Sequence, residues 1–88
     1  MRDFTAAIAE FQNVVKKYPE SSKVPSSLLK QGLSFFEMQS FEEAKAFLSK
    51  LAARFPQSGE AIRAQDKIRV IDRLFEIKAR EALEKKAM

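Results

Sequence analysis

The sequence predicts an all-α fold of the α-solenoid type, in which antiparallel helix pairs stack and a long C-terminal helix caps the stack. The first observation is an internal repeat with a shift of 37 positions: Phe4, Ala7, Phe11, Tyr18, Pro19 and Ser21 recur as Phe41, Ala44, Leu48, Phe55, Pro56 and Ser58. Such a period is typical of stacked helical repeats, because one unit cannot bury its apolar face alone. The second is composition: 88 residues, 45% hydrophobic and with only two glycines, indicate one globular helical domain.

Two helices are predicted on either side of Pro19. Apolar residues recur at helical spacing over residues 4–18, and Pro19 ends this first helix because the residue before a proline avoids the helical region. The second helix is predicted over residues 22–38, with Pro25 in its first turn, where a missing N–H does no harm. The predicted cap of this second helix is Ser21 or Ser22.

Two further helices are predicted in the second half. Ser40 and Glu43 have the spacing of a capping box that opens the third helix, and Pro56 closes it. The last helix is predicted over residues 60–85. Its apolar residues form two stripes, one of Ala61, Ala64, Ile68, Ile71 and Phe75, and one of Val70, Leu74 and Ile77. The second stripe has no obvious neighbour to pack on and is predicted to serve self-association into a homo-oligomer.

Five residues of the middle segment stand at the spacing of a known helical repeat: Gly32, Phe35, Ala44, Leu48 and Pro56. The two small residues allow a close approach of two helices, and the two large ones fill the space that remains. In these positions the chain resembles the tetratricopeptide repeat. Residues 22–56 resemble one complete repeat, and residues 3–19, with Ala7 and Phe11, resemble the second helix of a preceding one.

The last helix departs from that repeat. Arg69 and Asp72 stand 37 positions after Gly32 and Phe35, so a small and an aromatic residue are replaced by charged ones. The resemblance therefore implies that residues 60–85 form a cap, and that residues 1–88 make a single domain of this type.

Three short segments carry a narrower resemblance. Residues 18–25 read YPESSKVP, residues 28–36 read LLKQGLSFF, and residues 55–58 read FPQS. They resemble the YbgF family (also called CpoB), periplasmic proteins of the Tol–Pal system. This resemblance implies a periplasmic scaffold that binds a TolA-like protein and links outer-membrane constriction to peptidoglycan synthesis during cell division. Outer-membrane assembly lipoproteins of the BamD type have similar segments, so a module of that type, or a self-associating structural domain, is the alternative.

A groove for a protein or peptide partner is predicted on the second helix, because first helices line the concave face of such stacks. Leu29, Leu33 and Phe36 form an apolar stripe, which Lys30 and Glu37 flank. A helix or strand could bind along this stripe. The alternative is that the stripe packs on neighbouring helices as part of the core.

Catalysis and cofactor binding are not predicted. The chain has no histidine and no cysteine, so the commonest general base and the usual metal ligands are missing. The net charge of +4 arises mostly in the last segment, where acidic residues alternate with basic ones, which disfavours a nucleic-acid surface. No apolar run approaches the roughly 20 residues that span a bilayer, so no membrane insertion is predicted.

Overall fold

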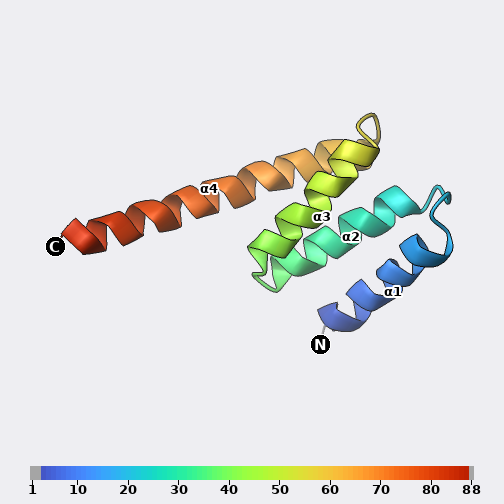
Figure 1. Ribbon diagram of the computed structural model, residues 1–88, viewed down its shortest axis with the longest axis horizontal. Helices are drawn as coiled ribbons and strands as arrows, with labels where there is room; N and C mark the ends of the chain where they lie inside the picture. The colour runs from blue at the N-terminus through green and yellow to red at the C-terminus, as the bar shows by residue number, and fades with distance from the viewer. Residues whose placement is uncertain (1–2, 88) are drawn as a thin grey trace.

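The computed structural model describes residues 3–87, and this part of the chain forms four helices (Figure 1). They are α1 (Phe4–Lys17), α2 (Val24–Glu37), α3 (Phe41–Arg54) and α4 (Gly59–Ala87). Helices α1, α2 and α3 are joined by short loops and run antiparallel to their neighbours, and α4 packs along α3 before projecting beyond it (Figure 1). No strand occurs among residues 3–87, so the predicted all-α fold with a long C-terminal helix is confirmed.

Asp3 caps the start of helix α1, and the helix ends before Pro19 as predicted. The Asp3 side chain accepts a hydrogen bond from the backbone N–H of Ala6 at 3.0 Å, which satisfies one of the free donors of the first turn. At the other end, Tyr18 leaves the helical conformation directly before Pro19. The N–H of Tyr18 still donates to the Val14 carbonyl at 2.9 Å.

Helix α2 begins later than predicted, and its cap was predicted wrongly. The residue that precedes the helix is Lys23, whose side chain makes no capping hydrogen bond. The Ser21 hydroxyl instead accepts from the N–H of Lys23 at 3.1 Å, so it stabilises the turn before the helix. Pro25 lies in the first turn, as predicted.

The loop between α2 and α3 explains why the predicted capping box does not form. The N–H of Ser40 donates to the Phe35 carbonyl and the N–H of Gln39 to the Phe36 carbonyl, both at 2.9 Å, which is the Schellman pattern at the end of a helix. Gln39 takes the left-handed conformation that this pattern requires, with φ of 63°. Because the Ser40 N–H is already used, Glu43 has no donor to accept from, and Ser40 makes no side-chain cap.

Helix α4 begins at Gly59, and the preceding Ser58 makes two hydrogen bonds at this start. Its hydroxyl donates to the Phe55 carbonyl at 2.7 Å and accepts from the N–H of Ala61 at 3.0 Å. The helix is 29 residues long, one residue longer at its start and two at its end than predicted. Its C-terminal half extends away from the other helices (Figure 1), and the side chains of residues 79–86 are all exposed.

The core lies between α2, α3 and α4. Its nine buried apolar residues are Val24, Leu28, Leu29, Ala44, Leu48, Leu51, Ala61, Ala64 and Ile71. Gly32 allows α2 and α3 to pack closely, since a Cβ atom there would lie 2.6 Å from Cδ2 of Leu48. The ring of Phe35 stacks on Phe47 with centroids 5.2 Å apart and fills the space beside this contact.

Helix α1 is the least buried of the first three. Its apolar residues, among them Phe4, Ala7 and Phe11, are at most half-buried, and none is fully buried. A polar contact joins it to the core: the side-chain amide of the buried Gln31 donates to the Ile8 carbonyl at 3.2 Å. Helix α1 therefore packs on one side of α2, and α3 and α4 pack on the other.

Candidate functional site

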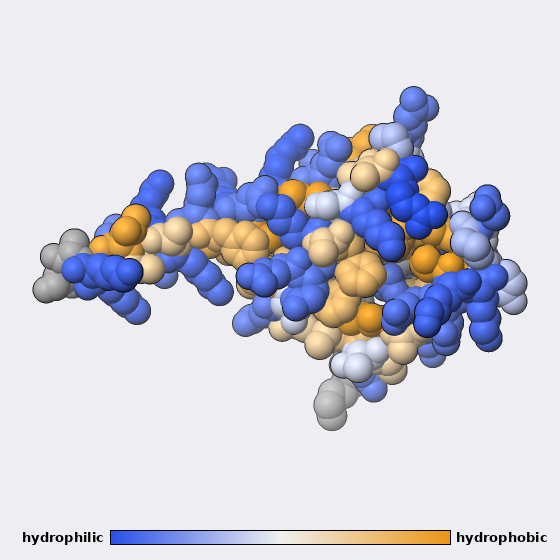
Figure 2. Space-filling model, viewed as in Figure 1, coloured by the Kyte–Doolittle hydropathy of each residue, from blue (hydrophilic) through white to orange (hydrophobic). Residues whose placement is uncertain are grey.

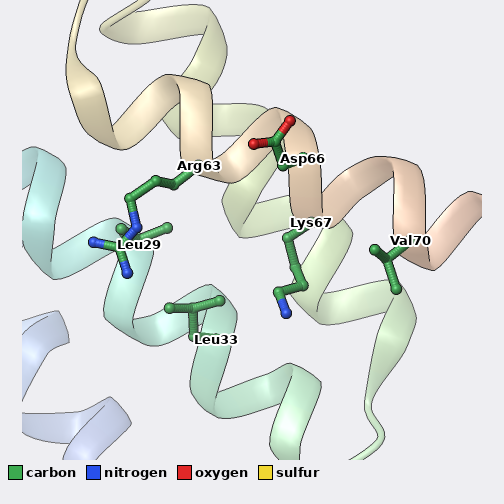
Figure 3. Close-up of a pocket in the computed structure, with 6 residues that line it drawn as sticks. All are labelled: Leu29, Leu33, Arg63, Asp66, Lys67 and Val70. Carbon is green, nitrogen blue, oxygen red and sulfur yellow. The ribbon is translucent and has the colours of Figure 1, made fainter.

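A groove lies between α2 and α4 (Figure 3). It has a volume of about 350 Å³. Its lining residues are Leu29 and Leu33 from α2, and Arg63, Asp66, Lys67 and Val70 from α4. We call this cavity the α2–α4 groove.

Helical spacing places these side chains on facing surfaces. Leu29 and Leu33 are four residues apart and so lie on one side of α2. Arg63, Lys67 and Val70 are spaced by four and then three residues and share one side of α4. The three apolar side chains form the floor of the groove, and the basic ones extend along its wall.

Positive charge predominates along the groove. Arg63 and Lys67 extend from α4 toward α2, whereas the Asp66 carboxylate points away from it (Figure 3). That carboxylate pairs with Arg69, whose Nη1 lies 3.1 Å from Oδ1 of Asp66. Because Asp66 faces another cation, the groove presents two cations beside an apolar floor. Acidic segments with apolar anchors are the ligands that such a surface attracts.

The structure divides the five residues that the sequence analysis placed in one groove. Leu29 and Leu33 line the α2–α4 groove, but Leu29 is only 2% exposed and belongs mainly to the core. Lys30 and Glu37 are exposed and, together with Leu33, line a second cavity, of about 270 Å³, between α1 and α2. We call this second cavity the α1–α2 groove.

Phe36, the fifth of these residues, is half-buried and packs within the fold. Its ring meets Phe41 of α3 edge-on, with centroids 5.2 Å apart. The ammonium group of Lys67 lies over the same ring, 4.4 Å from its centroid. Phe36 thereby fixes the Lys67 side chain at one end of the α2–α4 groove and does not line it.

Four residues of the groove come from α4 and were not predicted as partner-binding. A signal for two of them existed in the 37-residue register, which relates Leu29 to Asp66 and Leu33 to Val70. Positions that face the groove on one first helix face it again on the next, because the repeats stack in the same orientation. No such signal marks Arg63, whose equivalent is Ser26, or Lys67, whose equivalent Lys30 lines the α1–α2 groove.

The residues predicted for self-association follow one side of α4. Val70 is 45% exposed and Ile77 is 46% exposed, while Leu74 between them is half-buried. Figure 2 shows hydrophilic side chains standing out on both sides of the projecting part of α4, with apolar side chains between them. Val70 has two roles, since it also lines the α2–α4 groove.

Neither a metal-binding cluster nor a membrane-spanning helix occurs among the described residues. Among residues 3–87, no three acidic side chains come together in a way that could hold a metal ion. None of the helices in this range is long and apolar enough to cross a membrane.

The repeat pattern and the helix pairs agree with a known family. The family model of the tetratricopeptide repeat matches residues 1–21 and 26–58, which is more than half of the chain. Stacks of such repeats generally present extended surfaces to protein partners. No curated protein sequence matches the chain.

Proposed function

Because this chain belongs to the tetratricopeptide repeat family, we propose that it is a non-catalytic binding module that takes an acidic, partly apolar segment of another protein into the α2–α4 groove. The observation that supports this best is the lining of the groove. Leu33 and Val70 offer apolar contacts, Arg63 and Lys67 offer two cations, and Asp66 is turned toward Arg69.

The chemistry of the ligand follows from this lining. Apolar side chains of the ligand lose contact with water on the groove floor and supply affinity. Carboxylates of the ligand approach the guanidinium and the ammonium group, which orients the segment and speeds association at low salt. A basic segment would be repelled by the two cations, so the groove also selects against positively charged ligands.

The biological setting that we propose is the bacterial cell envelope. The segments YPESSKVP, LLKQGLSFF and FPQS resemble the YbgF family, whose members act in the periplasm with the Tol–Pal system. On this proposal the chain is a periplasmic scaffold, its partner is a TolA-like protein, and binding links outer-membrane constriction to peptidoglycan synthesis at division. A module of BamD-type assembly lipoproteins is the alternative within the same compartment.

A titration with the periplasmic region of TolA from the same organism tests both levels of this proposal. We expect binding by the unaltered chain, at least tenfold weaker binding by Arg63→Glu, and little change for Arg80→Glu. Arg80 is the matched control, because it is exposed on the same helix outside the groove. No binding by the unaltered chain would reject the Tol–Pal role. Equal binding by both variants would show that the ligand does not bind in the α2–α4 groove.

Self-association is a second candidate, and the exposure of Val70 and Ile77 supports it. Apolar side chains that follow one side of a helix lose their contact with water when two such helices pair. We expect an Ile77→Glu variant to have a lower mass than the unaltered chain in sedimentation equilibrium at high concentration. A monomeric unaltered chain under these conditions would exclude this candidate.

A further inference from the structure

One side of α4 carries a regular stripe along which the charge changes sign from one end to the other. Its members are spaced by alternating steps of four and three residues, which is the heptad spacing of helices that pair. In chain order they are Arg63, Lys67, Val70, Leu74, Ile77, Glu81 and Glu84. We call this set the α4 stripe. It has two cations at its start, three apolar side chains in its middle and two carboxylates at its end.

The structure leaves much of the α4 stripe accessible. Val70 and Ile77 are exposed, Leu74 between them is half-buried, and both carboxylates at the end are exposed. The half of α4 that carries these carboxylates extends away from the other helices, so a second chain can lie against it (Figure 1). None of the ion pairs formed within residues 3–87 involves a charge of the α4 stripe. Both ends of the stripe are therefore able to pair with an opposite charge from outside the described chain.

The order of the charges makes the α4 stripe complementary to itself in one orientation. When two copies of α4 lie side by side and run antiparallel, with Leu74 near the centre, the apolar middle of one stripe meets that of the other. The two cations at the start of each stripe then lie opposite the two carboxylates at the end of the other. A parallel pair in register would place each charge opposite its own kind, which is unfavourable. A surface that matches itself about a two-fold axis is what the symmetric pairing of two identical chains requires.

The start of the α4 stripe is also one wall of the α2–α4 groove. Arg63, Lys67 and Val70 are three of the four α4 residues that line this groove, and Leu33 of α2 lies across from them. A helix that pairs with the start of the stripe therefore covers the groove. In the antiparallel arrangement that helix is the projecting half of α4 from the second copy. Its apolar side chain at Ile77 and its two carboxylates give it the chemistry that the groove attracts.

We infer that two copies of the chain pair antiparallel through the α4 stripe, and that each copy thereby places Glu81 and Glu84 at the α2–α4 groove of the other. Pairing and the binding of another protein in that groove then exclude each other, so the dimer is the closed state of the module. Because pairing is governed by mass action, the groove closes as the concentration of the chain rises. This competition rests on the function proposed above for the α2–α4 groove, whereas the pairing itself does not.

Sedimentation equilibrium of the whole chain tests the pairing. At high concentration we expect a mass that approaches twice the 10.0 kDa of one chain. Glu81→Lys places a cation opposite Lys67 at both ends of the pair and should weaken the association at least tenfold. Glu76→Lys is the matched control, because it makes the same change of charge at an exposed position of α4 outside the stripe. This control should associate as the unaltered chain does.

A compensating substitution determines the orientation of the two helices. Adding Lys67→Glu to Glu81→Lys restores opposite charges in an antiparallel pair and should recover most of the lost affinity. In a parallel pair the same double variant would keep like charges opposite each other and would recover nothing. Arg63→Glu combined with Glu84→Lys repeats this test without changing the contact of Lys67 with Phe36. Circular dichroism of each variant shows whether it is folded.

A labelled peptide of residues 73–87 tests whether the projecting half of α4 binds at the groove. Its fluorescence anisotropy would be measured against the whole chain at concentrations below those of self-association. We expect saturable binding, at least tenfold weaker binding to the Arg63→Glu chain, and little change for the Arg80→Glu chain. A peptide that carries Glu81→Lys should also bind at least tenfold more weakly.

Several results would overturn the inference. A monomeric unaltered chain, or equal association of the Glu81→Lys and Glu76→Lys chains, would reject the antiparallel pairing. Association of the chain without any effect of Arg63→Glu on peptide binding would place the second copy away from the groove. These readouts are separate from the titration with TolA. TolA binding that Arg63→Glu weakens, together with a monomeric chain, would keep the proposed function and reject only this inference. Pairing without TolA binding would do the reverse.

Discussion

Helices α1 and α3 have the same length and share several apolar positions, yet they are buried to very different extents. Each has 14 residues, and Phe4, Ala7, Phe11 and Val14 of α1 correspond to Phe41, Ala44, Leu48 and Leu51 of α3 at a shift of 37. Ala44, Leu48 and Leu51 of α3 are fully buried, whereas no residue of α1 is. The difference comes from their neighbours, because α3 lies between α2 and α4 while α1 contacts α2 alone.

This comparison shows that the apolar pattern determines which side of a helix faces inward. The number of neighbouring helices determines how far that side is buried and how much it contributes to the stability of the fold. In stacked repeats the stability is close to a sum of terms for each repeat and for each contact between neighbours. Helix α1 has one such contact and α3 has two, so we expect α1 to open locally before the rest of the domain.

The largest expected effect comes from truncating equivalent residues of the two helices. Leu48→Ala should lower the free energy of unfolding by about 3–4 kcal/mol, because it leaves a cavity in a fully buried site. Phe11→Ala should cost only about 1–1.5 kcal/mol, since the ring is partly in contact with water before unfolding. Urea unfolding followed by circular dichroism measures both. Equal losses would mean that α1 is as well packed as α3.

An intermediate effect is expected where α2 meets α3. Gly32→Ala should cost about 2 kcal/mol, because its Cβ atom would lie 2.6 Å from Leu48. Gly59→Ala is the control: a Cβ atom there meets nothing within 4 Å, so this change should be neutral or slightly stabilising. In the Leu48→Ala background the cost of Gly32→Ala should shrink, since the side chain that it strikes is gone. Additive costs in that double variant would show that the strain lies elsewhere.

The smallest effect concerns the polar contact between α1 and α2. Gln31→Leu removes the hydrogen bond to the Ile8 carbonyl and should cost about 1 kcal/mol or less, because that carbonyl lies within a helix. Hydrogen exchange of the α1 amides should become faster, while the α3 amides keep their protection. Faster exchange in both helices to the same degree would show that α1 and α3 open together.

Much of the fold could be predicted from the sequence because its signals are local or periodic. The 37-residue shift related α1 to α3, and the prolines at positions 19 and 56 marked the ends of both helices. The caps were harder to predict. Ser40 has a capping-box sequence, but its N–H is used by the preceding helix, and that competition depends on the conformation of Gln39.

The candidate site could be predicted only in part, because it depends on how helices pack. Leu29 and Leu33 line the α2–α4 groove, whereas Lys30 and Glu37, which were predicted with them, line the neighbouring α1–α2 groove together with Leu33. Helical spacing places these four residues on adjacent parts of α2, and only the packing of α1 and α4 separates them into two grooves. The contribution of Arg63 depends on the path of α4 over α2, which no local pattern specifies.

The 29-residue α4 also has a mechanical consequence. Its N-terminal half is held against α3 through Ala61, Ala64 and Ile71, and its last 12 residues, after Phe75, extend freely for about 18 Å at roughly 1.5 Å per residue. A rigid rod held at one end amplifies rotation, so a tilt of about 10° at the groove would move its tip by about 3 Å over that length. A ligand in the α2–α4 groove that rotated the N-terminal half of α4 would therefore displace the helix near Lys86 by more than it displaces the groove itself.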